Sequence, residues 1–128
     1  MSGLSSYFMS TNRNKKSISI DLKTSEGKEI LKKLIESSDV LVENFRPGVM
    51  KKLGFSREKE MKINDKLIYC SISGFGQTGS MKDFPGYDLV ILAMSGLLGL
   101  TGNPGSPPVK FAVPIADYSP VNDFFLHL

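Results

Sequence analysis

The chain has 128 residues, of which 41% are hydrophobic and 23% charged, which predicts at most one globular domain with a buried core. No apolar stretch reaches the length of a membrane span, Met1 to Ser10 lack a signal-peptide pattern, and the only cysteine, Cys70, excludes an internal disulfide, so we expect a cytoplasmic protein that does not enter a membrane. The net charge of +3 comes without alternating basic and aromatic residues, so we do not expect nucleic-acid binding.

The first half of the chain is expected to alternate strands and helices. Residues 16–22 alternate apolar and polar side chains, which predicts a strand. Thr24 and Ser25 offer an N-cap to a helix with one apolar stripe. Pro47 and Gly48 mark a turn. The predicted elements in this half are a strand at 16–22, an amphipathic helix at 26–37, a strand at 39–45 and short helices at 49–53 and 56–65.

The second half predicts two further strands around one helix. A strand is expected at 66–73, a buried helix packed through Gly96 and Gly99 at 88–100, and a final strand at 109–117 that buries Phe111, Val113 and Ile115. Ser119-Pro120 resembles the opening of another helix. Strands alternating with helices favour the α/β class, a parallel sheet with right-handed crossovers and flanking helices.

Asp117 ends the last predicted strand, which draws attention to it as a site residue. In open α/β sheets, ligands bind beyond the carboxyl ends of the strands. A carboxylate at that edge is therefore a candidate for chemistry. The alternative is that Asp117 only caps the next helix, since aspartate is a favoured N-cap residue.

Two other strand ends carry candidate binding residues. Gly74 begins a G-x-G-x-x-G pattern, but Pro85 follows closely and no acidic residue stands at the required spacing, so we interpret it as a flexible glycine loop beside a ligand, not a dinucleotide fingerprint. At the other end, Asn44 could hydrogen-bond, Phe45 could stack on a base and Arg46 could pair with a phosphate. The alternative is a capped turn with an exposed arginine.

Thiol, histidine and metal chemistry find little support. Cys70 lies in the middle of a predicted strand with no histidine near it, which indicates an inert thiol. The single histidine, His127, stands in the terminal tail, so neither a histidine triad nor a metal site is expected.

Several blocks in order resemble the family III CoA-transferases, the CaiB/BaiF-like group that includes formyl-CoA transferase and the carnitine and bile-acid CoA-transferases. The resemblance runs from Tyr7 to Tyr118. The blocks are N-R-N-K-K-S (12–17), D-V-L-V-E-N-F-R-P-G-V-M-K-K-L-G (39–54), L-I-Y-C-S-I-S-G-F-G-Q-T-G (67–79), P-G-Y-D-L-V-I-L-A-M-S-G (85–96) and P-I-A-D-Y (114–118).

The resemblance implies a Rossmann-like large domain, a small domain and a homodimer whose chains interlock. It implies transfer of CoA from an acyl-CoA thioester to a carboxylic acid, with Asp117 as the nucleophile that passes through an aspartyl-CoA thioester. Coenzyme A, entering as the substrate thioester, is then expected to contact a set of residues at the strand ends. These are Asn44, Phe45, Arg46, Lys23, Ser73 and Gly74.

The resemblance leaves alternatives. The same fold serves α-methylacyl-CoA racemases, but these resemble G-H-D where this chain has Gly86-Tyr87-Asp88, and a phenol with a pKa of about 10 is a poor base at neutral pH. The family's first strand and helix have no counterpart before Met1, and residues 119–128 diverge from it. We therefore expect 1–128 to be part of a large domain with impaired transfer, or a non-catalytic remnant that binds CoA weakly.

Overall fold

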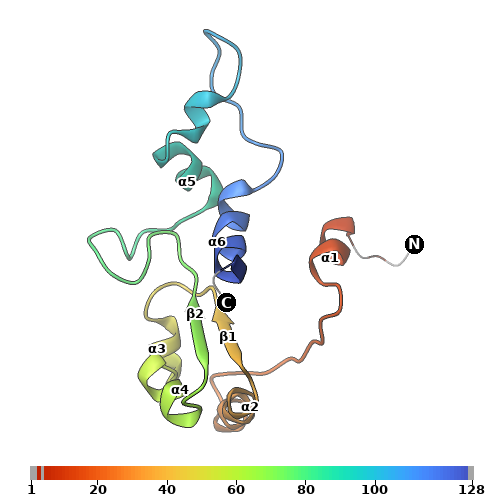
Figure 1. Ribbon diagram of the computed structural model, residues 1–128, viewed down its shortest axis with the longest axis vertical. Helices are drawn as coiled ribbons and strands as arrows, with labels where there is room; N and C mark the ends of the chain where they lie inside the picture. The colour runs from red at the N-terminus through yellow and green to blue at the C-terminus, as the bar shows by residue number, and fades with distance from the viewer. Residues whose placement is uncertain (1–2, 4, 127–128) are drawn as a thin grey trace.

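A computed structural model describes residue 3 and residues 5–126, with side chains through Pro120, and forms a mixed α/β structure (Figure 1). His127 lies outside the described residues. Among these residues, no helix is both long and apolar enough to cross a membrane. The elements in order are α1 (Ser6–Thr11), α2 (Ser25–Glu36), β1 (Val40–Glu43), α3 (Val49–Leu53), α4 (Arg57–Ile63), β2 (Ile68–Ser71), α5 (Asp88–Met94), the 3-10 helix η1 (Leu97–Leu100) and α6 (Ile115–Leu126).

The two strands β1 and β2 form a parallel pair, which confirms the predicted sheet direction. Their register sets Val40 opposite Ile68 and Glu43 opposite Ser71. The connection between them contains α3 and α4, because parallel strands need a crossover. Both strands are shorter than predicted, at four residues each. Their carboxyl ends point toward α6, which lies between the sheet and an arm built from α5 and η1 (Figure 1).

The core lies under the sheet, between α2 and the helices of the crossover. Its buried side chains are Ile35 of α2, Met50 of α3, Phe55 and Leu67. Full burial of each such side chain stabilises the fold by roughly 1.5–3 kcal/mol. Local signals placed these helices correctly: Thr24 accepts the Gly27 amide at 3.0 Å as an N-cap, so the apolar stripe of α2 starts where it was expected.

The predicted strand at 16–22 is wrong. Residues 15–21 have no regular structure, and Ile18 is 64% exposed. Alternation of apolar and polar residues makes a strand only where a neighbouring strand completes the hydrogen-bond ladder. In the described residues, the sheet consists of β1 and β2, and this segment pairs with neither.

The predicted long buried helix at 88–100 is also wrong. Helix α5 stops at Met94, and Gly96 takes a left-handed conformation with φ of +80° before η1 begins. Within these two helices only Asp88 and Leu92 are buried. A Cβ built on Gly96 or Gly99 would meet nothing within 4 Å, so the expected tight packing through these glycines is absent.

The predicted strand at 109–117 is replaced by an irregular segment and the start of α6. Pro108 and Pro114 remove backbone donors from the segment, which a sheet ladder would need. Val113 is 57% exposed, so the expected burial is not found. The carbonyl of Pro114 accepts the amides of Asp117 and Tyr118 at 3.2 Å, and this begins the helix earlier than the Ser119-Pro120 signal predicted.

Glu60 of α4 gives the fold a testable pH dependence. Its side chain is fully buried, neither oxygen has a hydrogen-bond partner within the described residues, and burial raises the pKa of this carboxyl. A raised folded pKa means that the ionised group opposes folding. Its penalty is absent below the unfolded pKa, near 4.3, and grows as the pH rises through the folded pKa.

We therefore expect Glu60→Leu to stabilise the protein at pH 7 by about 1–3 kcal/mol and to change it less at pH 4. Urea unfolding at both pH values measures this difference. The exposed Glu36→Leu variant is the control, since it should show no such pH-dependent gain. Parallel stability curves for wild type and Glu60→Leu would contradict the assignment.

Candidate functional site

A cleft of about 620 Å³ lies where the carboxyl ends of the two strands face α5 and α6. It gathers six of the seven residues expected to form the site. Lys23 is not among its lining residues; the exposed Lys23 stands in the turn before α2, where its backbone amide donates to Asp21 at 2.9 Å. The expected residues that line the cleft are Asn44, Phe45, Arg46, Ser73, Gly74 and Asp117.

The turn after β1 presents three of these side chains. Asn44 donates from its amide to the Ile72 carbonyl at 2.7 Å, which ties this turn to the end of β2. The Phe45 ring is 45% exposed and Arg46 is exposed. The Arg46 carbonyl accepts the Val49 amide at 3.1 Å as α3 begins, so the segment is also the turn that the alternative interpretation expected.

A buried carboxylate lies directly behind this turn. Glu43 is 9% exposed, accepts the Ser71 hydroxyl at one oxygen and accepts the Phe45 amide at 2.8 Å at the other. Burial, and next the charge of Glu43, raise the pKa of Tyr69 to about 12 and also raise the pKa of Cys70. A thiol held in its neutral form is a poor nucleophile, in agreement with the expectation for Cys70.

The glycine loop after β2 makes a close backbone contact. A Cβ built on Gly74 would overlap the Cα of Gly86, and the converse holds for Gly86. The two glycines therefore let the segments 72–74 and 85–87 touch along one wall of the cleft. The next helix begins only at Asp88, so the loop lacks the direct run into a helix that a dinucleotide fingerprint requires.

Asp117 reaches the cleft from the first turn of α6, not from the end of a strand. It is the third residue of this helix, and its side chain is exposed. It is therefore not the N-cap that the alternative interpretation assumed. The first turn of a helix is a favourable place for an acidic side chain, because of the helix dipole. An exposed carboxylate on the wall of an apolar cleft can act as an acceptor or as a nucleophile.

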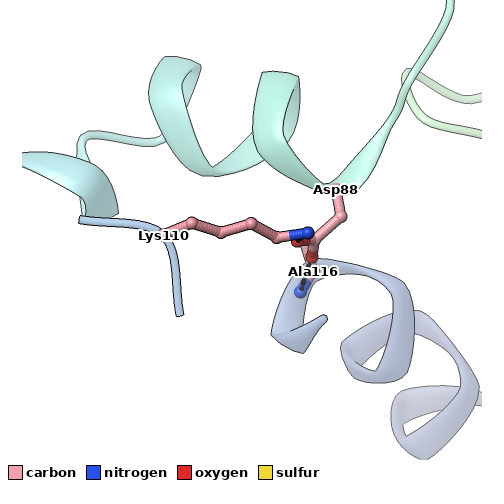
Figure 2. Close-up of polar contacts among 3 residues, drawn as sticks. All are labelled: Asp88, Lys110 and Ala116. Atoms are coloured by element: carbon pink, nitrogen blue, oxygen red, sulfur yellow. Dashed lines mark hydrogen bonds and ion pairs between the residues drawn. The ribbon is translucent and has the colours of Figure 1, made fainter. Parts of the chain in front are cut away.

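Asp88 holds the start of α6 in place (Figure 2). Its side chain is 7% exposed, and one oxygen accepts the Ala116 amide at 3.0 Å. The other oxygen lies 3.8 Å from the Lys110 ammonium group and has no hydrogen-bond partner in the described part of the chain. Because Ala116 precedes Asp117, this contact fixes where the Asp117 carboxylate enters the cleft.

A smaller hollow of about 300 Å³ beside α2 and α4 contains none of the expected site residues. Three lysines, Lys28, Lys32 and Lys59, line it around an apolar base. Across the part of the chain that the structure describes, no three His, Cys, Asp or Glu side chains gather as a metal site would require. The candidate chemistry therefore belongs to the larger cleft.

Sequence reasoning assigned no role in the site to Glu43, Gly86 and Asp88. Each had a signal. Glu43 shares its strand face with the core-facing Leu41, so it places a charge on an apolar face. Asp88 opens an otherwise apolar run, which is an unusual position for an acid. Gly86 precedes it, but a close backbone contact with Gly74 cannot be seen from sequence.

Residues 1–121 match the family model described as CoA-transferase family III. A succinate–glutarate CoA-transferase of Agrobacterium fabrum is 47% identical over 111 residues, which are 87% of this chain and 28% of the relative. An acetyl-CoA:oxalate CoA-transferase of Acetobacter aceti is 49% identical over 104 residues, 81% of this chain and 27% of the relative. The chain thus spans under a third of the length of these relatives.

Solved structures agree with this similarity. The crystal structure of a CAIB/BAIF family protein from Brucella suis superposes with a TM-score of 0.77 at 40% identity, covering 84% of this chain and 30% of that protein. A crystal structure from Mycobacterium tuberculosis gives a TM-score of 0.76 at 32% identity over 90% of this chain and 35% of that one. The relatives found by sequence and the solved structures found by fold are therefore in agreement.

Proposed function

The chain belongs to CoA-transferase family III, and we propose that its cleft binds an acyl-CoA thioester for transfer of CoA to a carboxylic acid, with Asp117 as the nucleophile. The observation that carries the proposal is the convergence of Asp117 with the turn Asn44–Arg46 in one cleft. The turn supplies a cation, an aromatic ring and an amide, and α6 supplies Asp117, an exposed acidic group that lines the cleft.

The proposed reaction splits one exchange into steps at the Asp117 carboxylate. The carboxylate attacks the thioester carbonyl, a mixed anhydride forms, and the C–S bond breaks to release the CoA thiolate. The thiolate then attacks the aspartyl carbonyl, which gives an aspartyl-CoA thioester and frees the donor acid. The acceptor carboxylate then attacks the aspartyl-CoA carbonyl, and the C–S bond breaks to release the CoA thiolate and leave a new anhydride. The thiolate attacks the acyl carbon of the acceptor, which gives the acceptor's CoA thioester and regenerates the Asp117 carboxylate.

The surrounding residues are assigned to binding. Arg46 pairs with a phosphate of CoA and Phe45 stacks on the base of CoA. Asn44 forms a hydrogen bond to the CoA molecule. Ser73 offers a buried hydroxyl with no partner among the described residues, and Gly74 offers close backbone approach. Lys23 lies outside the cleft, so its contact with CoA rests on the family resemblance alone.

We do not propose racemisation, because no observation supports a second acid–base group opposite Asp117. Tyr87 stands at the position considered for it, 66% exposed on the rim of the cleft. A phenol is a poor base at neutral pH.

The activity of this chain by itself and the assembly of the whole enzyme are two further parts of the proposal. The relatives are more than three times as long as the matched region, so we propose that this chain by itself supports acyl transfer slowly. We also propose that the full assembly is an interlocked homodimer in the cytoplasm, as the family resemblance implies.

Hydroxylamine trapping tests the role of Asp117. Succinyl-CoA is the probe: an anhydride or thioester at Asp117 reacts with hydroxylamine to leave a stable hydroxamate, which peptide mass spectrometry locates. We expect the hydroxamate at Asp117 in the wild type and none there in Asp117→Asn. The exposed Asp65→Asn variant is the matched control and should be labelled like the wild type. A wild-type chain without label at Asp117 would overturn the proposal.

A further inference from the structure

We propose that Glu43 is a positioning residue, which sets the geometry of the turn Asn44–Arg46 and joins this turn to the glycine loop through hydrogen bonds. The purpose of this turn, CoA binding, rests on the function proposed above. Glu43 does not line the cleft, so it acts through the residues that its carboxylate holds.

Both carboxylate oxygens of Glu43 are used. One accepts the hydroxyl of Ser71, the residue directly across the sheet. The other accepts the backbone amide of Phe45 at 2.8 Å, only two residues further along the chain. Hydrogen bonds to an ionised acceptor are roughly twice as strong as neutral ones, so the buried charge rigidly defines the backbone at Phe45.

The network continues into the glycine loop. The Gln77 amide donates to the Ser71 oxygen at 2.7 Å. A hydroxyl has one proton, and Ser71 donates it to Glu43. The Ser71 oxygen therefore accepts the Gln77 amide with a lone pair. The donor order Gln77, Ser71, Glu43 is therefore fixed. The Asn44 amide adds a second tie, to the Ile72 carbonyl at 2.7 Å. The turn after β1 and the glycine loop after β2, which both contribute lining residues to the cleft, are thus joined by hydrogen bonds.

The charge at Glu43 has an additional consequence that can be measured. Cys70 is the only cysteine, and burial followed by the charge of Glu43 raises the pKa of its thiol. Removing that charge should lower the Cys70 pKa. A change in the pH profile of thiol modification between wild type and a Glu43 variant therefore reports on this carboxylate, whether or not CoA binds.

Glu43→Gln is the informative variant, because it keeps the shape and removes the charge. The two bonds use different oxygens of the carboxylate, and in glutamine one of these oxygens is replaced by an NH2 donor, so the side chain cannot accept the Ser71 hydroxyl and the Phe45 amide at the two positions that Glu43 uses. We expect hydrogen exchange of the Phe45 amide to quicken at least about tenfold, while exchange of the Ile35 amide in α2 stays unchanged. We expect the dissociation constant for CoA, measured by calorimetry, to rise about tenfold. The exposed Glu36→Gln variant should change neither.

The outcomes separate this proposal from the proposed function. Unchanged exchange at Phe45 and an unchanged thiol profile would overturn the positioning role. Faster exchange at both Phe45 and Ile35 would also overturn it, because Glu43 would then act only on global stability. If the wild type fails to bind CoA but Glu43→Gln frees the Phe45 amide and shifts the thiol profile, the positioning role stands and the proposed function falls. Ser71→Ala should reproduce part of the Phe45 effect, since it removes one of the two bonds that hold the carboxylate.

Discussion

Replacing Gly74 with alanine should lower the free energy of unfolding by about 1–3 kcal/mol and remove detectable CoA binding. The new Cβ would overlap the Cα of Gly86, and the overlap cannot be relieved by side-chain rotation, because the backbone fixes the position of the Cβ and the Cα of Gly86 is itself a backbone atom. The segments 72–74 and 85–87 must then separate. Since both line the cleft, the change alters its wall as well as its stability. Urea unfolding and calorimetry with CoA measure the two effects.

Gly99→Ala is the matched control for this prediction. A Cβ there would meet nothing within 4 Å, and the backbone is not left-handed, so its stability should change by less than about 0.5 kcal/mol. Gly86→Ala should resemble Gly74→Ala, and the double variant should cost little more than either one, because the first alanine already separates the backbones. Additive losses in the double variant would show that the two glycines do not meet.

The sheet and the helices of the crossover could be predicted because their signals are local. The Thr24 hydroxyl caps α2, Gly54 ends α3 with a left-handed φ of +98°, and short apolar runs mark β1 and β2. These features depend on neighbours within a few residues. Parallel pairing followed from the order of elements, since a helical crossover requires it.

The segment before Asp117 could not be predicted in the same way. Its short apolar run is typical of a buried strand, but a strand also needs a partner with free backbone groups. Pro108 and Pro114 argue against a strand in this segment, because each removes an amide donor. Asp117 lines the cleft, but the helix α6 brings it there and not the sheet edge that was predicted.

Within the site, sequence reasoning found the exposed residues and missed the buried ones that hold them. Asn44, Phe45 and Arg46 stand together in the chain, so one motif revealed them. Glu43 and Asp88 act through contacts that span 28 positions in sequence, to Ser71 and to Ala116. No single-sequence pattern encodes contacts of that range. Lys23, assigned by resemblance alone, is the expected residue that the cleft does not include.

Replacing Asp88 with alanine should reduce hydroxamate formation at Asp117 by at least about tenfold. The Ala116 amide would lose its carboxylate acceptor, and a hydrogen bond to a charged group is worth about 1.5–3 kcal/mol. The first turn of α6 would no longer be held at the start of α5, so the Asp117 carboxylate would leave its position in the cleft. Trapping with hydroxylamine, at a temperature where circular dichroism shows that Asp88→Ala remains folded, measures the loss.

Two further variants distinguish the hydrogen bond from the ion pair. Asp88→Asn keeps an oxygen that can accept the Ala116 amide, so it should retain most of the labelling. Lys110→Met should change it little, because the Lys110 side chain is 56% exposed and its 3.8 Å ion pair is worth about 0–1 kcal/mol. If Lys110→Met impaired labelling as strongly as Asp88→Ala, the ion pair and not the Ala116 contact would hold the helix. If Asp88→Ala labelled like the wild type, contacts other than Asp88 would hold α6. Asp88 would then not position the Asp117 carboxylate.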